Sequence, residues 1–266
     1  HGKVIFQILD FLPTSVTKGI PDSLRYLYTF PFKNRNFLDN AYLRISFKFM
    51  DITVGKQQIS LGTGYVWNPT DVYNFKNLLD PTYEQPGHNA LRFDIPLGLK
   101  YKLMVIYSPE DNWKRSAKLI QFKGNVGHFD YSVIAISRNW IFTDYYTFEP
   151  VIQQRTLFGG DFAGEVLGLG VWGEVAYNDM EITENYWESV FGIDYTFKTG
   201  TYILGEYYLN TSGKTDYRDY DLNDWIRYIS AETKTISRDQ FYFYISHPAT
   251  DLLKTGCSVI FNINDK

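Results

Sequence analysis

The amino-acid sequence predicts an all-β fold: an antiparallel up-and-down transmembrane β-barrel with about 14 or more strands when complete. Segments of roughly ten residues alternate apolar and polar side chains, the period of a β-strand with two different faces. The connectors between these segments alternate short and long. Aromatic residues gather toward the segment ends and aliphatic residues nearer the middle, as in strands that face lipid.

The clearest alternating segment runs from Tyr186 to Phe197. Its apolar side is expected to carry Trp187, Ser189, Phe191, Ile193, Tyr195 and Phe197. Its other side is expected to carry mostly Glu188, Gly192, Asp194, Thr196 and Lys198. A period of two places these sets on opposite faces of one strand.

The bulk composition supports one large folded unit. With 266 residues, the chain is long enough for one all-β unit or two modest domains, and we expect a single barrel domain over residues 1–266. Apolar residues make up 44% and aromatic residues 18%, which disfavours disorder. No stretch approaches the roughly 18 consecutive apolar residues that a spanning helix needs. The net charge of −4 gives no reason to expect nucleic acid.

The alternating pattern predicts about thirteen strands. They are expected near Lys3–Leu9, Ala41–Met50, Asp51–Leu61, Asn89–Ile95, Leu99–Ser108, Ala117–Lys123, Phe129–Ser137, Gln153–Ala163, Gly168–Tyr177, Tyr186–Phe197, Thr201–Leu209, Gln240–His247 and Thr255–Asn262. An odd number of strands does not fit a closed bacterial barrel, which has an even number. We therefore expect a chain that is incomplete at one or both ends, or a further strand within Arg25–Phe32.

Short and long connectors alternate along the chain. The short connectors are Met50–Asp51, Pro96–Gly98, Gly124–His128, Gly164–Leu167, Lys198–Gly200 and Pro248–Lys254. The long connectors are Asp10–Asn40, Gly62–His88, Pro109–Ser116, Arg138–Ile152, Asn178–Asn185 and Asn210–Asp239. This order places short turns on one rim of a barrel and long loops on the other. A soluble Greek-key sandwich, the competing fold, has no reason to sort its connectors in this way.

Two of the long connectors are expected to carry short helices. In Asn68–Tyr73, Asn68 can cap a helix and Pro69 suits its first position. In Asp219–Ile229, apolar residues fall at the spacing of an amphipathic helix. Such helices either fold into the barrel mouth or pack on neighbouring loops, and the sequence leaves both arrangements open.

Segments around Ala41–Leu103 resemble a known family. They are Ala41–Arg44, Gly55–Gly64, Trp67–Asn74, Asn89–Arg92 and Pro96–Gly98. The chain is similar there to Gram-negative outer-membrane barrels of the porin and alginate-export-like kind. The resemblance implies an integral barrel in the outer membrane that takes part in passage of solutes or polymers. Leu61 stands where an aromatic residue often follows Ile-Ser in such segments, a mild departure.

Motifs for chemistry are weak. Gly168–Gly173 matches G-x-G-x-x-G but continues as a strand pattern, so a dinucleotide site is not expected. Asp219, Asp221 and Asn223 begin like a calcium loop, yet Asp224 stands where glycine is needed. Cys257 is a single cysteine and the four histidines are scattered. We expect no cofactor, no metal and no enzyme; a Ser–His pair assembled across loops is the remaining catalytic alternative.

Charged strand residues are expected to line the interior, because a charge facing lipid at the membrane midplane costs about 2–4 kcal/mol. The predicted pore-lining residues are Arg44, Lys48, Lys56, Gln58, Arg92, Asp94, Lys102, Glu174, Glu188, Asp194 and Glu206. The early strands then form a basic wall and the later strands an acidic wall. Simple alternation would place Lys56 and Gln58 on the same face as the apolar Ile52 and Val54. Their interior position therefore requires a change of face or a bulge near Gly55.

These features predict a porin-like outer-membrane channel for passive passage of small polar or anionic solutes or polymers. Trp67, Asn68, Asp71 and Tyr73 are expected to lie on a constriction loop at its mouth. The expected partners are outer-membrane lipid and lipopolysaccharide, with a homo-oligomer or a membrane complex as further options. The alternative is a plugged structural barrel that anchors partner proteins, in which the interior charges only pair with one another.

Overall fold

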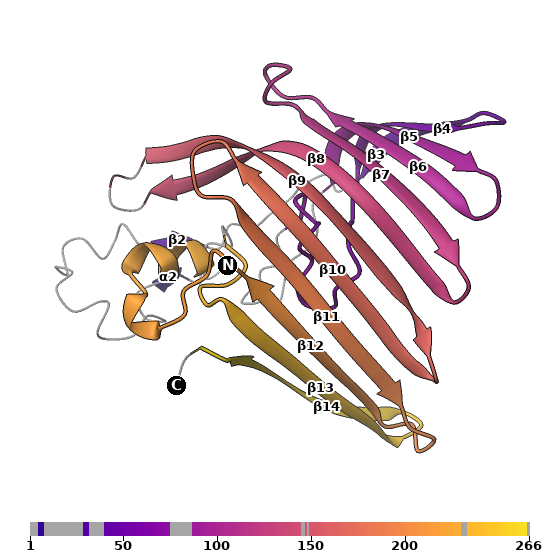
Figure 1. Cartoon of the computed structure of the whole chain (residues 1–266), viewed down its shortest axis with the longest axis vertical. Coiled ribbons are helices and arrows are strands. Elements are labelled where there is room, and N and C mark those ends of the chain that lie inside the picture. The colour runs from indigo at the N-terminus through magenta and orange to yellow at the C-terminus, as the bar shows by residue number, and fades with distance from the viewer. Residues whose placement is uncertain are drawn as a thin grey trace.

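In the computed structural model, residues 5–7, 29–31, 40–74, 87–144, 147, 149–229 and 233–264 are described. Twelve strands form one antiparallel sheet in which each strand pairs with its neighbours along the chain (Figure 1). They are β3 Ala41–Ser46, β4 Asp51–Gln57, β5 His88–Leu97, β6 Tyr101–Ser108, β7 Ala117–Val126, β8 Phe129–Asp144, β9 Glu149–Val166, β10 Leu169–Met180, β11 Tyr186–Thr196, β12 Tyr202–Asn210, β13 Asp239–Thr250 and β14 Leu253–Asn262.

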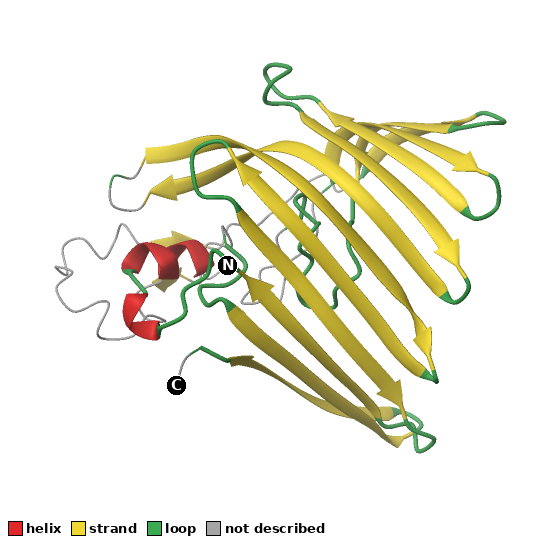
Figure 2. Cartoon of the chain, in the orientation of Figure 1, coloured by secondary structure: helices red, strands yellow, loops and turns green. Residues whose placement is uncertain are grey.

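This order confirms the predicted all-β, up-and-down architecture. The short connectors lie at one end of the strands and the β4–β5 and β12–β13 connectors at the other (Figure 2). The long loop predicted at Arg138–Ile152 is wrong, because β8 and β9 continue as a paired ribbon as far as Asp144 and Glu149. The sheet is strongly curved, and its edge strands β3 and β14 do not pair with one another within the described residues (Figure 1).

The strand predicted at Lys3–Leu9 does not belong to this sheet. Its described part, β1 Ile5–Gln7, pairs with β2 Thr29–Pro31 in a separate two-stranded sheet. The further strand expected within Arg25–Phe32 is therefore present as β2, although it also lies outside the large sheet. The count of thirteen becomes twelve for the large sheet.

The outer face of the sheet is apolar and exposed. Val133 is 55% exposed, Phe158 54% and Phe191 52%. In β11, Trp187, Phe191 and Ile193 are exposed, while Glu188, Val190 and Gly192, which alternate with them, are buried. The alternation in this strand is confirmed, and it gives the outer face the character of a lipid-contacting surface.

The concave face of the sheet is packed. Ile106, Leu119, Ile136 and Leu157 form a row across four neighbouring strands, and all four are buried. Ile59, Leu61, Val72 and Tyr73 of the β4–β5 connector belong to the same apolar cluster. Full burial of one such side chain contributes roughly 2 kcal/mol. Apolar contact therefore favours an inward position for this connector.

The two predicted helices have different outcomes. Helix α2, Leu222–Ile229, is present, and Asp221 and Asp224 cap its start through reciprocal hydrogen bonds to their backbone N–H groups. The helix predicted over Asn68–Tyr73 is wrong, because this segment is irregular with a turn at Pro69 and Thr70. The Asp71 side chain accepts the backbone N–H groups of Tyr73 and Asn74 and so competes with helical hydrogen bonds. In the described part of the chain, no helix has the length and apolar character needed to cross a membrane.

Candidate functional site

Residues 58–74 of the β4–β5 connector, called the inward loop below, lie on the concave side of the sheet (Figure 1). Trp67, Asp71 and Tyr73 are buried there and Asn68 is half-buried. These are the four residues predicted to form a constriction. The structure brings them together on one segment inside the curved sheet.

Glu206 of β12 binds the inward loop through three consecutive backbone N–H groups. Its carboxylate accepts Tyr65 N at 2.6 Å, Val66 N at 2.8 Å and Trp67 N at 3.1 Å. The indole of Trp172 donates a fourth hydrogen bond at 2.8 Å. Consecutive N–H groups that converge on one point form an anion-binding nest. Here the anion is a side chain of the barrel wall, fully buried at 0% exposure.

Glu174 of β10 binds the same loop on either side of this nest. Its carboxylate accepts Thr63 N at 3.0 Å, Gly64 N at 3.4 Å and Thr70 N. Gly62 adopts a φ of +80°, and a Cβ at this position would lie 2.5 Å from a carboxylate oxygen of Glu174. Glycine suits this position because φ lies in the left-handed region and because an added Cβ would displace the Glu174 carboxylate from its hydrogen bonds.

Inside the loop, Asp71 organises the backbone. It accepts hydrogen bonds from Leu61 N, Tyr73 N and Asn74 N. Burial raises the pKa of the Asp71 carboxyl, and these hydrogen bonds oppose the rise. Trp67 stacks on Tyr208 of β12 with ring centroids 5.2 Å apart. Polar and aromatic contacts thus fix the loop on the late strands.

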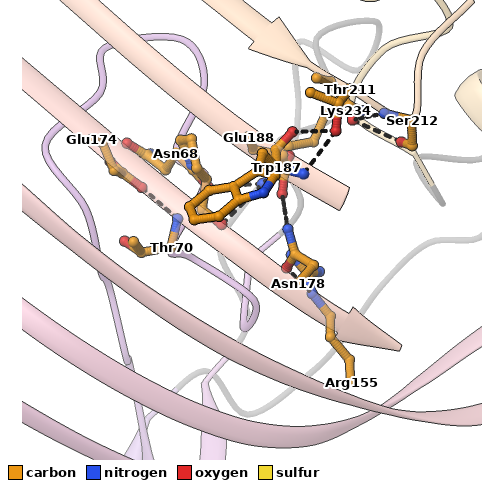
Figure 3. A network of polar contacts seen from close by, with 12 residues as sticks. Asn68, Thr70, Arg155, Glu174, Asn178, Trp187, Glu188, Thr211, Ser212 and Lys234 are labelled. Carbon is orange, nitrogen blue, oxygen red and sulfur yellow. Dashed lines mark hydrogen bonds and ion pairs between the residues drawn. The ribbon is translucent and has the colours of Figure 1, made fainter. Parts of the chain in front are cut away.

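Glu188 of β11 is the centre of a buried polar network (Figure 3). It accepts hydrogen bonds from Arg155 at 3.2 Å, Asn178 at 3.2 Å and Tyr208 at 2.6 Å. Arg155 also donates to the Asn178 side chain at 2.6 Å. A buried charge is tolerated when it is paired and hydrogen-bonded, and Glu188 meets both conditions.

Lys234 of the β12–β13 loop connects this network to the inward loop (Figure 3). Its ammonium donates to Glu188 at 3.1 Å, to the backbone oxygen of Asn68 at 2.9 Å and to that of Pro69 at 3.4 Å. Two long connectors that are far apart in sequence therefore meet at one ammonium group. Asp194, the remaining predicted pore-lining carboxylate of the late strands, accepts a hydrogen bond from the Tyr202 hydroxyl at 2.9 Å.

The early strands carry a different kind of ionic arrangement. Asp94 of β5 forms ion pairs with Arg92 at 2.8 Å and with Lys102 at 2.7 Å. Arg44 of β3 pairs with Asp51. The cationic side chains are 26%, 42% and 56% exposed for Arg92, Lys102 and Arg44. Asp94 itself is buried, but its cationic partners are accessible to water, in contrast to the glutamates of the late strands.

Three predicted interior residues lie elsewhere than expected. Lys48 falls in the β3–β4 connector and is exposed. The β4 strand pairs without a register shift through Lys56, so no change of face occurs at Gly55. Gln57 is buried on the inner side, and by alternation its neighbours Lys56 and Gln58 belong to the opposite face. An uninterrupted ladder is the physical reason for this difference.

A cavity of about 390 Å³ lies at the long-loop end of the strands. Trp140, Tyr186, Asn210 and Lys234 are among the residues that line it. The Glu188 network borders the same cavity. Its walls come from the extended ends of β8 and β9 and from the β10–β11 and β12–β13 connectors.

Sequence reasoning missed several residues of this site. Arg155 and Asn178 have interior parity in strands, and the rule applied to the other charged strand residues could have identified Arg155. Lys234 and Arg138 gave no such signal; Arg138 donates to the backbone oxygen of Val72. The G-x-G-x-x-G segment lies in the β9–β10 turn and in β10, with no helix after it.

No protein-family model and no curated protein matches the chain. Among solved structures, it is similar to in-vitro folded OmpT in its trimer form, an outer membrane protein of Vibrio cholerae. The TM-score is 0.53 at 14% sequence identity, and the match covers 88% of this chain and 73% of that chain. This likeness shows the fold: the chain has the architecture of an outer-membrane β-barrel protein. The outer membrane is the location consistent with that architecture.

Proposed function

We propose that the chain forms a porin-like channel of the outer membrane, narrowed by the inward loop, which passes small polar or anionic solutes passively. The observation that carries this proposal is the binding of the inward loop to Glu174 and Glu206 on the inner wall. A loop fixed by buried, charge-assisted hydrogen bonds keeps one shape, and a fixed constriction can select solutes.

The distribution of charge supports the preference for small polar or anionic solutes. Glu174 and Glu206 are buried and bound to backbone N–H groups, and Glu188 is buried and paired with Arg155 and Lys234, so these carboxylates are not exposed to a passing solute. Arg92 and Lys102 remain partly exposed on the early strands. Exposed cations on a pore wall favour anions. The proposal assigns no catalytic step to the protein.

The same proposal assigns the outer face to the membrane. Exposed apolar residues such as Val133, Phe158 and Phe191 would contact lipid and the acyl chains of lipopolysaccharide. Assembly into a homo-oligomer would bury part of this face and is compatible with the channel. The resemblance to alginate-export-like barrels remains a prediction.

A planar-bilayer recording tests the channel. We expect the folded wild-type protein to give stepwise conductance with a preference for chloride over potassium. The Lys102→Gln variant should shift the reversal potential toward cations and leave conductance within about twofold, because it removes one exposed charge from the wall. Folded protein that gives no conductance above the detergent control would refute the channel.

A plugged structural barrel is the second candidate, and the packing of the inward loop favours it. Apolar contacts of Ile59, Leu61 and Val72 add to the polar contacts that hold the loop in the interior. This candidate predicts no conductance and recovery of the protein in a large complex after extraction with mild detergent. A monomer or homo-oligomer that conducts ions contradicts it.

A further inference from the structure

We propose that the cavity at the long-loop end is a binding site for a small neutral polyhydroxylated solute, a ligand of the saccharide class. The inference deepens the proposed channel function, because it names a solute class for the outer end of the pathway. It is carried by the size, charge balance and hydrogen-bonding groups of the cavity walls.

The cavity has the dimensions of a ligand site. Its volume of about 390 Å³ lies within the range of roughly 300–1,000 Å³ that small-molecule pockets occupy. It lies between the rigid ends of long strands and two connectors, so its walls are largely preformed. Lys234 and Glu188 line it and also reach the inward loop or its supporting strand. A solute bound here would therefore lie next to the constriction.

The charges of the cavity are balanced, and four of the six form ion pairs. Its lining holds three basic and three acidic side chains: Lys214, Arg227, Lys234, Glu184, Glu188 and Asp224. Lys234 donates to three oxygen atoms, and Glu188 is bound by both Lys234 and Arg155. Lys214 lies 4.0 Å from Asp224. A charged ligand would gain little net attraction here and would compete with existing pairs.

Most of the other lining side chains carry a hydroxyl or an amide, among them Thr183, Asn185, Thr211 and Ser212. Such groups bind ligand hydroxyls as both donors and acceptors. They therefore match a neutral solute with many hydroxyl groups better than an ion.

Asn210 contributes an amide donor to the cavity wall. It is only 7% exposed, and its Oδ1 accepts Ser212 N at 3.0 Å and the Ser212 hydroxyl at 2.7 Å. Its Nδ2 donates no hydrogen bond to any residue that the structure describes. This nitrogen is not among the buried atoms that lack a partner, so it is accessible and can donate hydrogen bonds to a ligand oxygen in the cavity that Asn210 lines.

An aromatic wall completes the site. Trp140 lines the cavity, and the guanidinium of Arg155 lies 4.4 Å from its ring centroid. The second aromatic residue of the lining, Tyr186, lies 5.8 Å from the same guanidinium. Rings that are held in place lose little conformational freedom on binding. The apolar face of a sugar ring can pack on such a wall while its hydroxyls reach the amides.

The test is titration calorimetry of maltose into the detergent-solubilised full chain, with inorganic phosphate and glutamate as charged probes. We expect saturable binding of maltose that exceeds the binding of either charged probe. Asn210→Asp keeps the acceptor for Ser212 and removes the donors, so it should weaken maltose binding at least about tenfold. Trp140→Ala should weaken it to a similar extent.

The matched control is Trp113→Ala, since Trp113 is a 69% exposed tryptophan of the β6–β7 connector that does not line the cavity. It should leave maltose affinity unchanged. The inference is overturned if maltose does not bind, if phosphate or glutamate binds better, or if both cavity variants, Asn210→Asp and Trp140→Ala, bind maltose like the wild type. Binding is measured without a bilayer, so a protein that conducts ions but binds no maltose refutes this inference alone. A protein that binds maltose but does not conduct refutes only the channel.

Discussion

The interior faces of the early and late strands carry the same kind of residue but use it differently. On β10–β12, Glu174, Glu188 and Glu206 are buried, and each is bound by several donors. On β5 and β6, Asp94, Arg92 and Lys102 form ion pairs that water reaches. Alternation places both sets on one face, yet among the described residues the inward loop is hydrogen-bonded to Glu174 and Glu206 of the late set and not to the charged groups of the early set. The difference shows that burial, and not strand position, decides whether an interior charge holds the structure or remains available to solutes.

The largest effect is expected from Glu206→Ala on the late strands. The change leaves three backbone N–H groups and the Trp172 indole without their acceptor, which should cost roughly 3 kcal/mol or more of unfolding free energy. Urea unfolding in detergent measures it. The control is Asp194→Ala, because Asp194 accepts a hydrogen bond from Tyr202 and none is seen to the described part of the inward loop. Equal losses in both variants would contradict the special role of Glu206.

Gly62→Ala should have the next largest effect. The new Cβ would meet a Glu174 oxygen at 2.5 Å and would also occupy a backbone conformation with φ +80°. We expect a loss of about 2 kcal/mol from strain and displacement of the loop.

Gly98→Ala is the matched control for this change. Gly98 has nearly the same φ, +79°, but no atom lies within 4 Å of its added Cβ. It should cost only about 1 kcal/mol. If the two alanine variants unfold at the same urea concentration, the close approach of Gly62 to Glu174 is unimportant.

Lys234→Met tests the link between the two long connectors. The substitution removes the hydrogen bonds to Asn68 O and Pro69 O but leaves Arg155 paired with Glu188. We expect a loss of about 1–2 kcal/mol and faster amide hydrogen exchange in the inward loop. Lys214→Met serves as the control, since Lys214 only approaches Asp224 at 4.0 Å. Unchanged amide exchange in Lys234→Met would show that Lys234 does not link the two connectors.

The smallest effect on stability is expected on the early strands. Lys102→Gln breaks one ion pair with a 42% exposed side chain, so the unfolding free energy should change by about 0–1 kcal/mol. A loss as large as that of Glu206→Ala would erase the distinction between the two regions.

Much of the fold could be predicted from the sequence. The period of two in β11 places Glu188 inside and Trp187 outside, and connector parity gives the up-and-down order. Residues 138–152 were predicted to form a loop, so the continuation of β8 and β9 to Asp144 and Glu149 was not predicted. The inner position of Gln57 was not predicted, because a change of face or a bulge was expected near Gly55, whereas the ladder continues through this glycine and keeps Gln57 on the same face as Thr53.

The partners in the site could not be predicted in the same way. Glu206 and the backbone of Tyr65 are 141 positions apart, and Lys234 lies 166 positions from Asn68. A sequence does not show which backbone N–H groups bind a carboxylate, since every residue except proline has one. Alternation therefore identifies which carboxylates point inward, and only the three-dimensional structure shows what they bind.

Single-channel conductance of the Glu174→Gln, Glu206→Gln double variant tests the fixed constriction most directly, with Asp194→Asn as its control. Each glutamine offers one acceptor oxygen where the carboxylate offered two and carries no charge, so the loop should loosen. The account predicts a conductance at least about twofold above wild type for the double variant, with noisier open states, and an unchanged conductance for Asp194→Asn. A double variant that is folded and conducts like the wild type would show that these glutamates do not hold the constriction.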